Sequence, residues 1–219
     1  GQSIPPALFA RRLRKMPLKK HALAVWTLCM GLPFLALALV WGFIPAAHAH
    51  TWMAPLFLAL YGVFSCCHGL NQISYSTLQG KLLPVRLRGR MLAVATFSGS
   101  GMAIVFAWWL MGSWLALPDG GFTFIFGFTG ICFALAAAGA LFIREMPDDA
   151  AKLGAAVAHP LRGAWDVLRH DANFRKLAVV VMLSAIGTVL FPHYQALARE
   201  RLGLVGGNLM IWVIVQNAA

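Results

Sequence analysis

The fold is decided by one uncharged stretch, residues 21–80, which reads HALAVWTLCMGLPFLALALVWGFIPAAHAHTWMAPLFLALYGVFSCCHGLNQISYSTLQG. A helix of about 20 apolar residues crosses the hydrocarbon core of a bilayer, so this stretch is long enough for two spans. A charge at the bilayer centre costs several kcal/mol, which explains why Lys, Arg, Asp and Glu are missing from it. Four shorter uncharged runs follow, at 91–118, 120–143, 177–198 and 202–219. The pattern predicts an all-α, polytopic transmembrane helical bundle.

The composition agrees with this fold class. Of the 219 residues, 60% are hydrophobic and 11% are charged, whereas charged residues make up about 25% of ordinary soluble domains. The formal net charge of +11 comes from basic clusters between apolar runs, so the expected partner is the lipid bilayer and not nucleic acid. The cysteines lie inside apolar runs and are interpreted as small buried hydrophobic residues: Cys29, Cys66, Cys67 and Cys132.

About six spans are predicted, and the break between the first two is the proline-marked segment 45–51. If the chain alternates sides, sixteen of the eighteen basic residues lie on one side of the membrane. The positive-inside rule makes that side cytoplasmic. The chain is expected to be a segment of a longer protein with the last span cut short. The predicted spans are 22–44, 52–78, 91–115, 122–143, 177–194 and one opening near Gly206.

The second span carries a polar stripe. At about 100° per residue its polar side chains fall on one side of the helix, and polar groups within a membrane usually face the bundle interior or an aqueous cavity. Lining a substrate path is the sharper interpretation, and interhelical hydrogen bonding is the alternative. Near the end of the fifth span, His193 after Pro192 is a further path candidate, or an interfacial histidine without a role. The stripe consists of Tyr61, Ser65, His68, Gln72, Tyr75, Ser76 and Gln79.

The third and fourth spans carry small residues at intervals of four. Such spacing lets two membrane helices approach closely, so these positions predict helix packing. They are Ala95, Gly99 and Ala103 in the third span, and Gly130 and Ala134 in the fourth.

Enzyme and metal signatures are missing from the sequence. No predicted span contains Asp or Glu, and no nucleophile elbow, phosphate loop or His-Glu-x-x-His motif occurs. The run Cys66, Cys67, His68 is not a metal site, because consecutive helical side chains diverge by about 100° and cannot converge on one ion. We therefore expect no enzyme activity, no cofactor and no metal.

The longest polar segment, 145–176, is predicted to be a linker. Within it Leu161, Trp165 and Leu168 recur at helical spacing after Pro160, which favours a short amphipathic helix on the cytoplasmic membrane face. An irregular linker is the alternative.

Two local patterns resemble the major facilitator superfamily. The first is Pro84-Val-Arg-Leu-Arg88-Gly89-Arg90 at the entry to the third span, which is similar to that family's loop between helices 4 and 5. The second is Pro192-x-Tyr194 followed by Leu202-Gly203, which resembles the end of helix 7. The segment 10–20 keeps the family's basic charge but lacks the aspartate and glycines usual in that loop.

The resemblance implies a domain organisation. Residues 1–21 would hold the end of helix 2 and a cytoplasmic basic loop, and 22–144 helices 3 to 6 of the N-terminal bundle. Residues 145–176 would link the bundles, and 177–219 would form helix 7 and the start of helix 8. The loop that moves between conformations would contain Pro84, Arg88, Gly89 and Arg90.

The resemblance also implies a function. A secondary active transporter of a small solute, working by alternating access with a possible coupling proton or ion, is the expectation. Its location would be the bacterial inner membrane, with the basic loops cytoplasmic. The alternative is a non-transporting membrane scaffold or assembly factor with the same fold.

Overall fold

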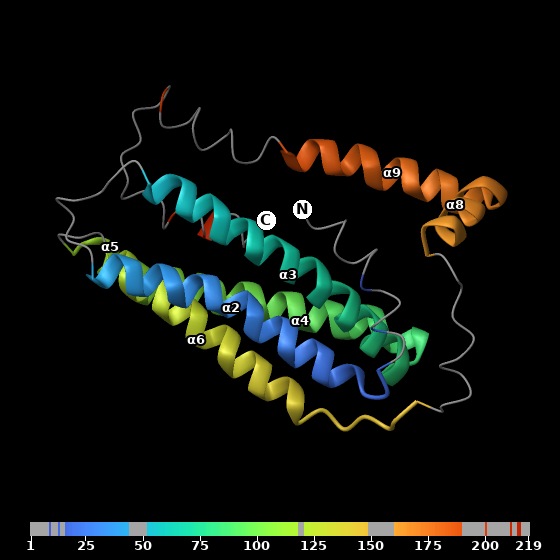
Figure 1. Cartoon of the computed structure of the whole chain (residues 1–219), viewed down its shortest axis with the longest axis horizontal. Helices are drawn as coiled ribbons and strands as arrows, with labels where there is room; N and C mark the ends of the chain where they lie inside the picture. Colours follow the sequence, from blue (N-terminus) through green and yellow to red (C-terminus); the bar gives the residue numbers. More distant parts are fainter. Residues whose placement is uncertain are drawn as a thin grey trace.

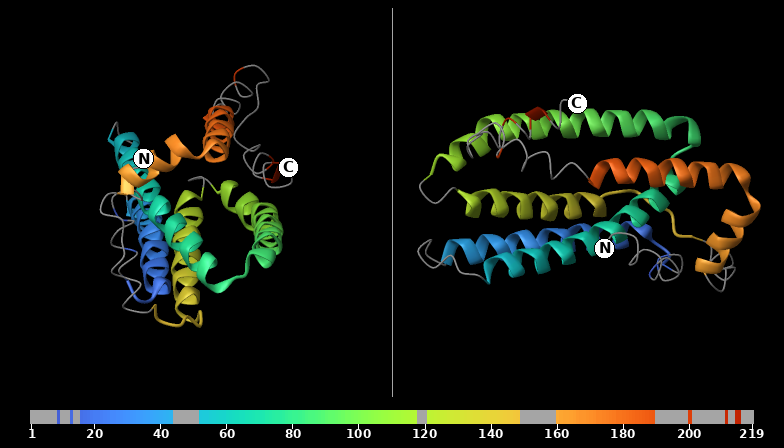
Figure 2. Two further views of the ribbon diagram at one scale, coloured as in Figure 1. Left: turned by 90° about the vertical axis from the view of Figure 1, so that its right-hand side faces the viewer. Right: turned by 90° about the horizontal axis from the view of Figure 1, so that it is seen from above.

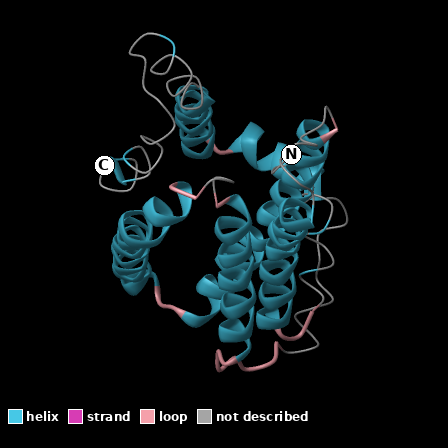
Figure 3. Ribbon diagram, turned by 90° about the vertical axis from the view of Figure 1, so that its left-hand side faces the viewer, coloured by secondary structure: helices cyan, strands magenta, loops and turns pink. Residues whose placement is uncertain are grey.

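The computed structural model describes residues 16–43, 52–117, 121–148 and 160–189, together with the isolated positions 9, 13, 200, 211, 214 and 215. Across these described residues the chain consists of helices and short connections, with no strand (Figure 3). The all-α prediction is therefore confirmed for this part of the chain. Four helices, Lys19–Phe43, Met53–Leu82, Val85–Leu115 and Phe122–Leu141, are long and apolar enough to cross a membrane, which makes this an integral membrane protein.

The centre of the molecule is helix α2 (Lys19–Phe43), which packs against α6 (Phe122–Leu141) on one side and α3 (Met53–Leu82) on the other (Figure 1). Aromatic rings fill the junction of the three helices. The ring of Phe34 from α2 lies 5.2 Å from that of Phe64 in α3 and 5.8 Å from that of Phe133 in α6. These contacts make α2, α3 and α6 one packed unit.

Glycines allow α2 and α6 to approach closely. A Cβ atom on Gly31 would lie 2.9 Å from Cβ of Phe133 and 3.1 Å from the carbonyl oxygen of Gly130. A Cβ atom on Gly130 would in turn lie 2.5 Å from Cδ2 of Leu35. The two glycines therefore face each other across the contact, as close packing of membrane helices requires.

Helix α4 (Val85–Phe106) continues through a π-helix, η2 (Ala107–Met111), into the single turn α5 (Gly112–Leu115). This helical rod stands apart from α2 and α6 along most of its length (Figure 2), and α4 has no buried residue. An aromatic cluster joins its far end to α6, where the ring of Phe106 stacks on Phe128 at 4.7 Å and Trp114 lies 5.8 Å from Phe128.

The entry to α6 depends on Gly121. Its φ of 59° is in the left-handed region, and a Cβ atom there would lie 2.2 Å from the carbonyl oxygen of Trp114. Only glycine fits this conformation and this approach.

Two further helices, α8 (Pro160–His170) and α9 (Ala172–Val189), are separated by the single residue Asp171 and pack against each other. Helix α8 runs across the direction of α9 and not along it (Figures 1 and 2). The short helix predicted after Pro160 is thus confirmed. Helix α9 begins at Ala172, so the last five residues of the predicted linker 145–176 are helical.

The helix ends differ most from the predicted span ends where charged residues lie nearby. Helices α2 and α4 begin at Lys19 and Val85, before the predicted starts at 22 and 91, since Lys and Arg are good helix formers. Helix α3 likewise continues to Leu82 instead of stopping at 78, and α6 ends at Leu141 instead of 143. Residues 190–194 and most of the sixth predicted span lie outside the described residues.

The predicted packing positions differ in how deeply they are buried. Gly130 is buried in the α2–α6 contact, whereas Ala134 is only half-buried. The buried residues that follow Gly130 on α6 are Ala137 and Ala140, so the contact face advances by seven and three residues and not by fours. In α4, Ala95 and Gly99 are exposed, Ala103 is half-buried, and a Cβ atom on Gly99 would meet nothing within 4 Å among the described atoms. Packing of this stripe therefore stays a prediction, because no partner for it lies among the described helices.

Candidate functional site

The polar stripe lies on membrane-length helix α3, away from its packed face. That packed face, with Cys67, Leu70, Ser74 and Leu78, rests on α2. On the stripe itself Tyr61, Gln72 and Ser76 are exposed, with Tyr61 at 53%. Ser65, His68, Tyr75 and Gln79 are half-buried. A run of accessible polar groups thus follows the helix outside the packed core.

One edge of the stripe turns toward the core. Tyr75 packs against the buried cluster formed by Leu23, Ala24, Leu78 and Ala140. The ring of His68 stacks on that of Phe64, with 5.9 Å between the centroids. These two predicted path residues therefore also support the packing of the helices.

Sequence reasoning missed Asn71, which lies one turn from His68. Its Nδ2 is 3.1 Å from the Met30 sulfur on α2. Its Oδ1 and the Nδ1 of His68 are buried with no hydrogen-bond partner among the described residues. Buried polar atoms left unpaired are costly, so these two atoms, one on the stripe and one beside it, are placed to bind a polar group or water. Their spacing of three on one helix was the signal available in the sequence.

The cavity of about 280 Å³ found in the described part of the chain is separate from the stripe. Its lining is apolar and comes from α2, α3 and the preceding segment: Phe9, Leu13, Met16, Trp26, Leu70, Ile73 and Ser74. None of the stripe residues lines this cavity.

The predicted conformational loop is a tighter structure than expected. Only Leu83 and Pro84 connect α3 to α4, and Arg88, Gly89 and Arg90 lie within α4. The prediction that these three residues belong to a loop is wrong, because the segment after Pro84 continues as helix without a break. The Arg88 guanidinium donates hydrogen bonds to the carbonyl oxygens of Leu83 (3.1 Å) and Gly80 (2.9 Å). Arg88 thereby caps the last turn of α3 and ties it to α4.

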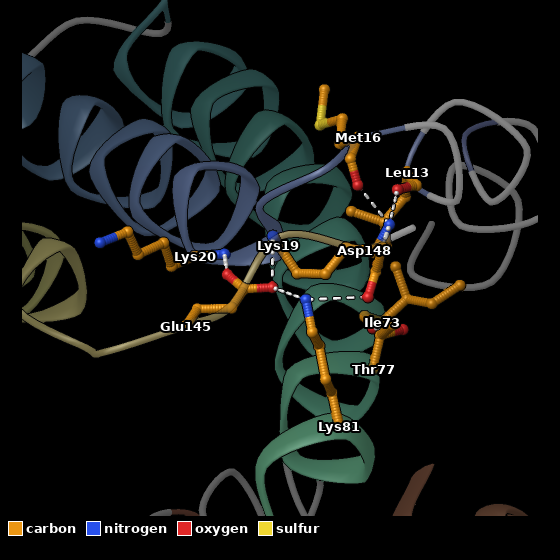
Figure 4. A network of polar contacts seen from close by, with 9 residues as sticks. All are labelled: Leu13, Met16, Lys19, Lys20, Ile73, Thr77, Lys81, Glu145 and Asp148. Atoms are coloured by element: carbon orange, nitrogen blue, oxygen red, sulfur yellow. Dashed lines mark hydrogen bonds and ion pairs between the residues drawn. The ribbon is translucent and has the colours of Figure 1, made fainter. Parts of the chain in front are cut away.

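The strongest polar cluster was not predicted. Glu145, beyond the end of α6, has a fully buried carboxylate that lies against the start of α2 (Figure 4). Its oxygens accept hydrogen bonds from the backbone N–H groups of Lys19 (2.9 Å) and Lys20 (2.8 Å). The first turn of α2 contains no acidic residue, so Glu145 supplies the N-terminal cap from more than 120 positions away.

Lys81 completes the cluster from the end of α3. Its Nζ lies 2.7 Å from Oε1 of Glu145 and 2.9 Å from Oδ1 of Asp148. The Nζ of Lys19 lies 3.4 Å from Oδ2 of the same aspartate (Figure 4). We call Lys19, Lys81, Glu145 and Asp148 the ionic clamp. It joins the start of α2, the end of α3 and the segment that follows α6. We call this end of the molecule, where Lys19, Lys81 and Arg88 lie, the basic end.

The ionic clamp lowers the pKa of both of its carboxyl groups. Burial alone would raise the pKa of Glu145, but the hydrogen bonds from Lys81 and from the N–H groups of Lys19 and Lys20 outweigh it, so the pKa lies below its ordinary value. The pKa of Asp148 is lowered mainly by the Lys81 hydrogen bond, against a smaller opposing effect of burial. Both groups are charged at neutral pH.

These pKa shifts predict acid sensitivity. A carboxyl group with a lowered pKa stabilises the fold above its ordinary pKa of about 4, and this contribution is lost as pH falls through the folded value. The melting temperature of the detergent-solubilised protein should therefore fall as pH is lowered from about 5 through the folded pKa values, which lie below about 4. A Glu145→Gln, Asp148→Asn variant should show a smaller fall, and an equal fall in both proteins would contradict the prediction.

Comparisons with models of known protein families, with curated proteins and with solved structures find no match for this chain. The family resemblance thus rests on the sequence patterns alone. Of the predicted site residues, His193 lies outside the described part of the chain. The described residues contain no group of three side chains placed to ligate a metal ion.

Proposed function

We propose that this chain belongs to a secondary active transporter, similar to the major facilitator superfamily, that moves a small solute by alternating access. The observation that carries the proposal is the polar stripe of α3. Tyr61 and Gln72 are exposed on a helix of membrane length, and lipid offers such groups no hydrogen-bond partners. A water-filled path beside α3 would solvate them.

The packing of the described helices also supports this mechanism. Alternating access works largely by rocking one rigid bundle against another around a central site. The aromatic junction around Phe34 and the ionic clamp around Glu145 hold α2, α3 and α6 together at two levels. Such a unit can move as one body while the stripe of α3 stays on its surface.

The topology proposed with this function places the basic end in the cytoplasm. Lys19, Lys81 and Arg88 then lie on the side where the positive-inside rule expects them. We propose the inner membrane of a bacterium as the location. A proton or another ion would drive the transport.

The proposal is tested by the reactivity of single cysteines toward a membrane-impermeant thiol reagent. In a variant with the four native cysteines replaced, Gln72→Cys is expected to react, from either side of the membrane in different states. Val63→Cys is the matched control, since Val63 is 52% exposed but lies outside the stripe and would face lipid. If Gln72→Cys is as unreactive as Val63→Cys, the transporter proposal fails and a non-transporting scaffold is the better account.

Replacing His68 and Gln72 by Leu tests the site residues. We expect the transport rate to fall by about tenfold or more, because each lost hydrogen-bonding side chain contributes about 1 kcal/mol. Uptake into proteoliposomes would be measured for the solute that the unmodified protein moves, chosen from labelled sugars, amino acids and organic acids. Leu56→Met is the control, and membrane insertion should be the same in all variants. Unchanged uptake would reject the assignment of these two residues.

A further inference from the structure

Helix α8 carries apolar side chains that the described part of the chain leaves uncovered. Trp165 is 63% exposed and Val167 is 47% exposed, and the helix packs against α9 alone among the elements with substantial contacts. A strongly amphipathic helix with an exposed tryptophan is typical of segments that lie in a membrane interface.

Asp171 fixes the direction of α8 relative to α9. Its N–H donates to the carbonyl oxygen of Val167 (2.8 Å) and so completes the last turn of α8. Its Oδ1 accepts hydrogen bonds from the N–H groups of Asn173 (2.9 Å) and Phe174 (3.1 Å), which caps the start of α9. With one residue between the helices, α8 is held across α9 (Figures 1 and 2). If α9 leads the fifth span across the bilayer, α8 must run along the membrane surface.

Three cations outnumber the two carboxylates at this junction, Asp166 and Asp171. Arg169, Arg175 and Lys176 are all exposed, and none forms an ion pair with a carboxylate in the part of the chain that the structure describes. At the depth where α8 meets the lipid headgroups, three unpaired cations favour anionic phospholipid over zwitterionic phospholipid.

We propose that α8 is an in-plane membrane anchor, with Trp165 among the acyl chains and Arg169, Arg175 and Lys176 bound to anionic phospholipid headgroups. The inference rests on α9 crossing the membrane, as the proposed function requires. It does not depend on whether solute passes along α3.

The test uses the full chain, with native cysteines replaced, in vesicles that contain phosphatidylcholine and phosphatidylglycerol. An environment-sensitive fluorophore is attached at Trp165→Cys or, as the matched control, at the neighbouring polar position Asp166→Cys. We expect blue-shifted emission, quenched by brominated lipid, from the label at position 165 only. Equal emission from both positions would overturn the anchor.

Headgroup selection is tested by bromination of one lipid at a time. Brominated phosphatidylglycerol should be enriched about fivefold around the label at position 165, the factor that corresponds to about 1 kcal/mol. The variant Arg169→Gln, Arg175→Gln, Lys176→Gln should lose this preference, whereas Arg86→Gln, Arg90→Gln on α4 should keep it. Equal quenching by the two brominated lipids would overturn the anionic-lipid assignment. The thiol test at Gln72 has an independent outcome, so failure of the anchor and failure of the transport path are distinguishable.

Discussion

Replacing Glu145 by Ala is expected to lower the free energy of unfolding by about 2–4 kcal/mol, because removal of one partner of a buried ion pair leaves the other partner uncompensated. The substitution removes the cap of α2 as well as the Lys81 contact. Lys81 keeps Asp148 as a partner and is 21% exposed, so the loss stays below the largest values known for buried pairs. Thermal unfolding in detergent, followed by circular dichroism, would measure it.

Two variants separate the contributions of Glu145. Glu145→Gln keeps one acceptor oxygen for the backbone N–H groups of α2, so its effect should be about half as large. Asp148→Ala should cost about 1 kcal/mol or less, since this carboxylate is partly exposed and makes weaker contacts with the helix start. If Asp148→Ala destabilises the protein as much as Glu145→Ala, the capping role assigned to Glu145 is wrong.

Replacing Gly130 by Val is expected to separate α2 from α6 and cost about 3 kcal/mol or more. A Cβ atom at this position would lie 2.5 Å from Cδ2 of Leu35 and 3.2 Å from its backbone nitrogen, which only a shift of the helix can relieve. We expect a lower melting temperature and a smaller fraction of monodisperse protein in size-exclusion chromatography.

Gly139→Val is the matched control on the same helix. A Cβ atom on Gly139 meets nothing within 4 Å among the described atoms, and the substitution keeps the same loss of glycine and gain of a β-branched side chain. Its melting temperature should change little. Similar losses in both variants would show that valine weakens α6 itself, independently of its contact with α2.

The sequence predicted the helices well because the bilayer imposes a simple rule on them. An uncharged run of sufficient length marks a span, and the predicted ranges 22–44 and 122–143 overlap almost fully with α2 and α6. The helix ends were harder, because charged residues such as Lys19 and Lys81 continue a helix as readily as leucine does.

The polar contacts of the basic end could not be predicted from one sequence. Glu145 meets Lys19 and Lys81 across separations of 126 and 64 residues, and no local spacing connects them. Gly130 was found because small residues recur around it. Gly31 was missed because its partner surface is supplied by another helix, and only the three-dimensional packing shows that the two glycines face each other.

The contact between α2 and α6 has a consequence for biosynthesis. Helix α2 ends at Phe43 and its main partner begins at Phe122, so 78 residues lie between the two along the chain. At a translation rate of about 5–20 residues per second, α6 begins to leave the ribosome about 4–16 s after the end of α2. During that interval the glycine-lined surface around Gly31 lacks its cover, and the insertion machinery of the cell must keep this helix from pairing with the wrong neighbour.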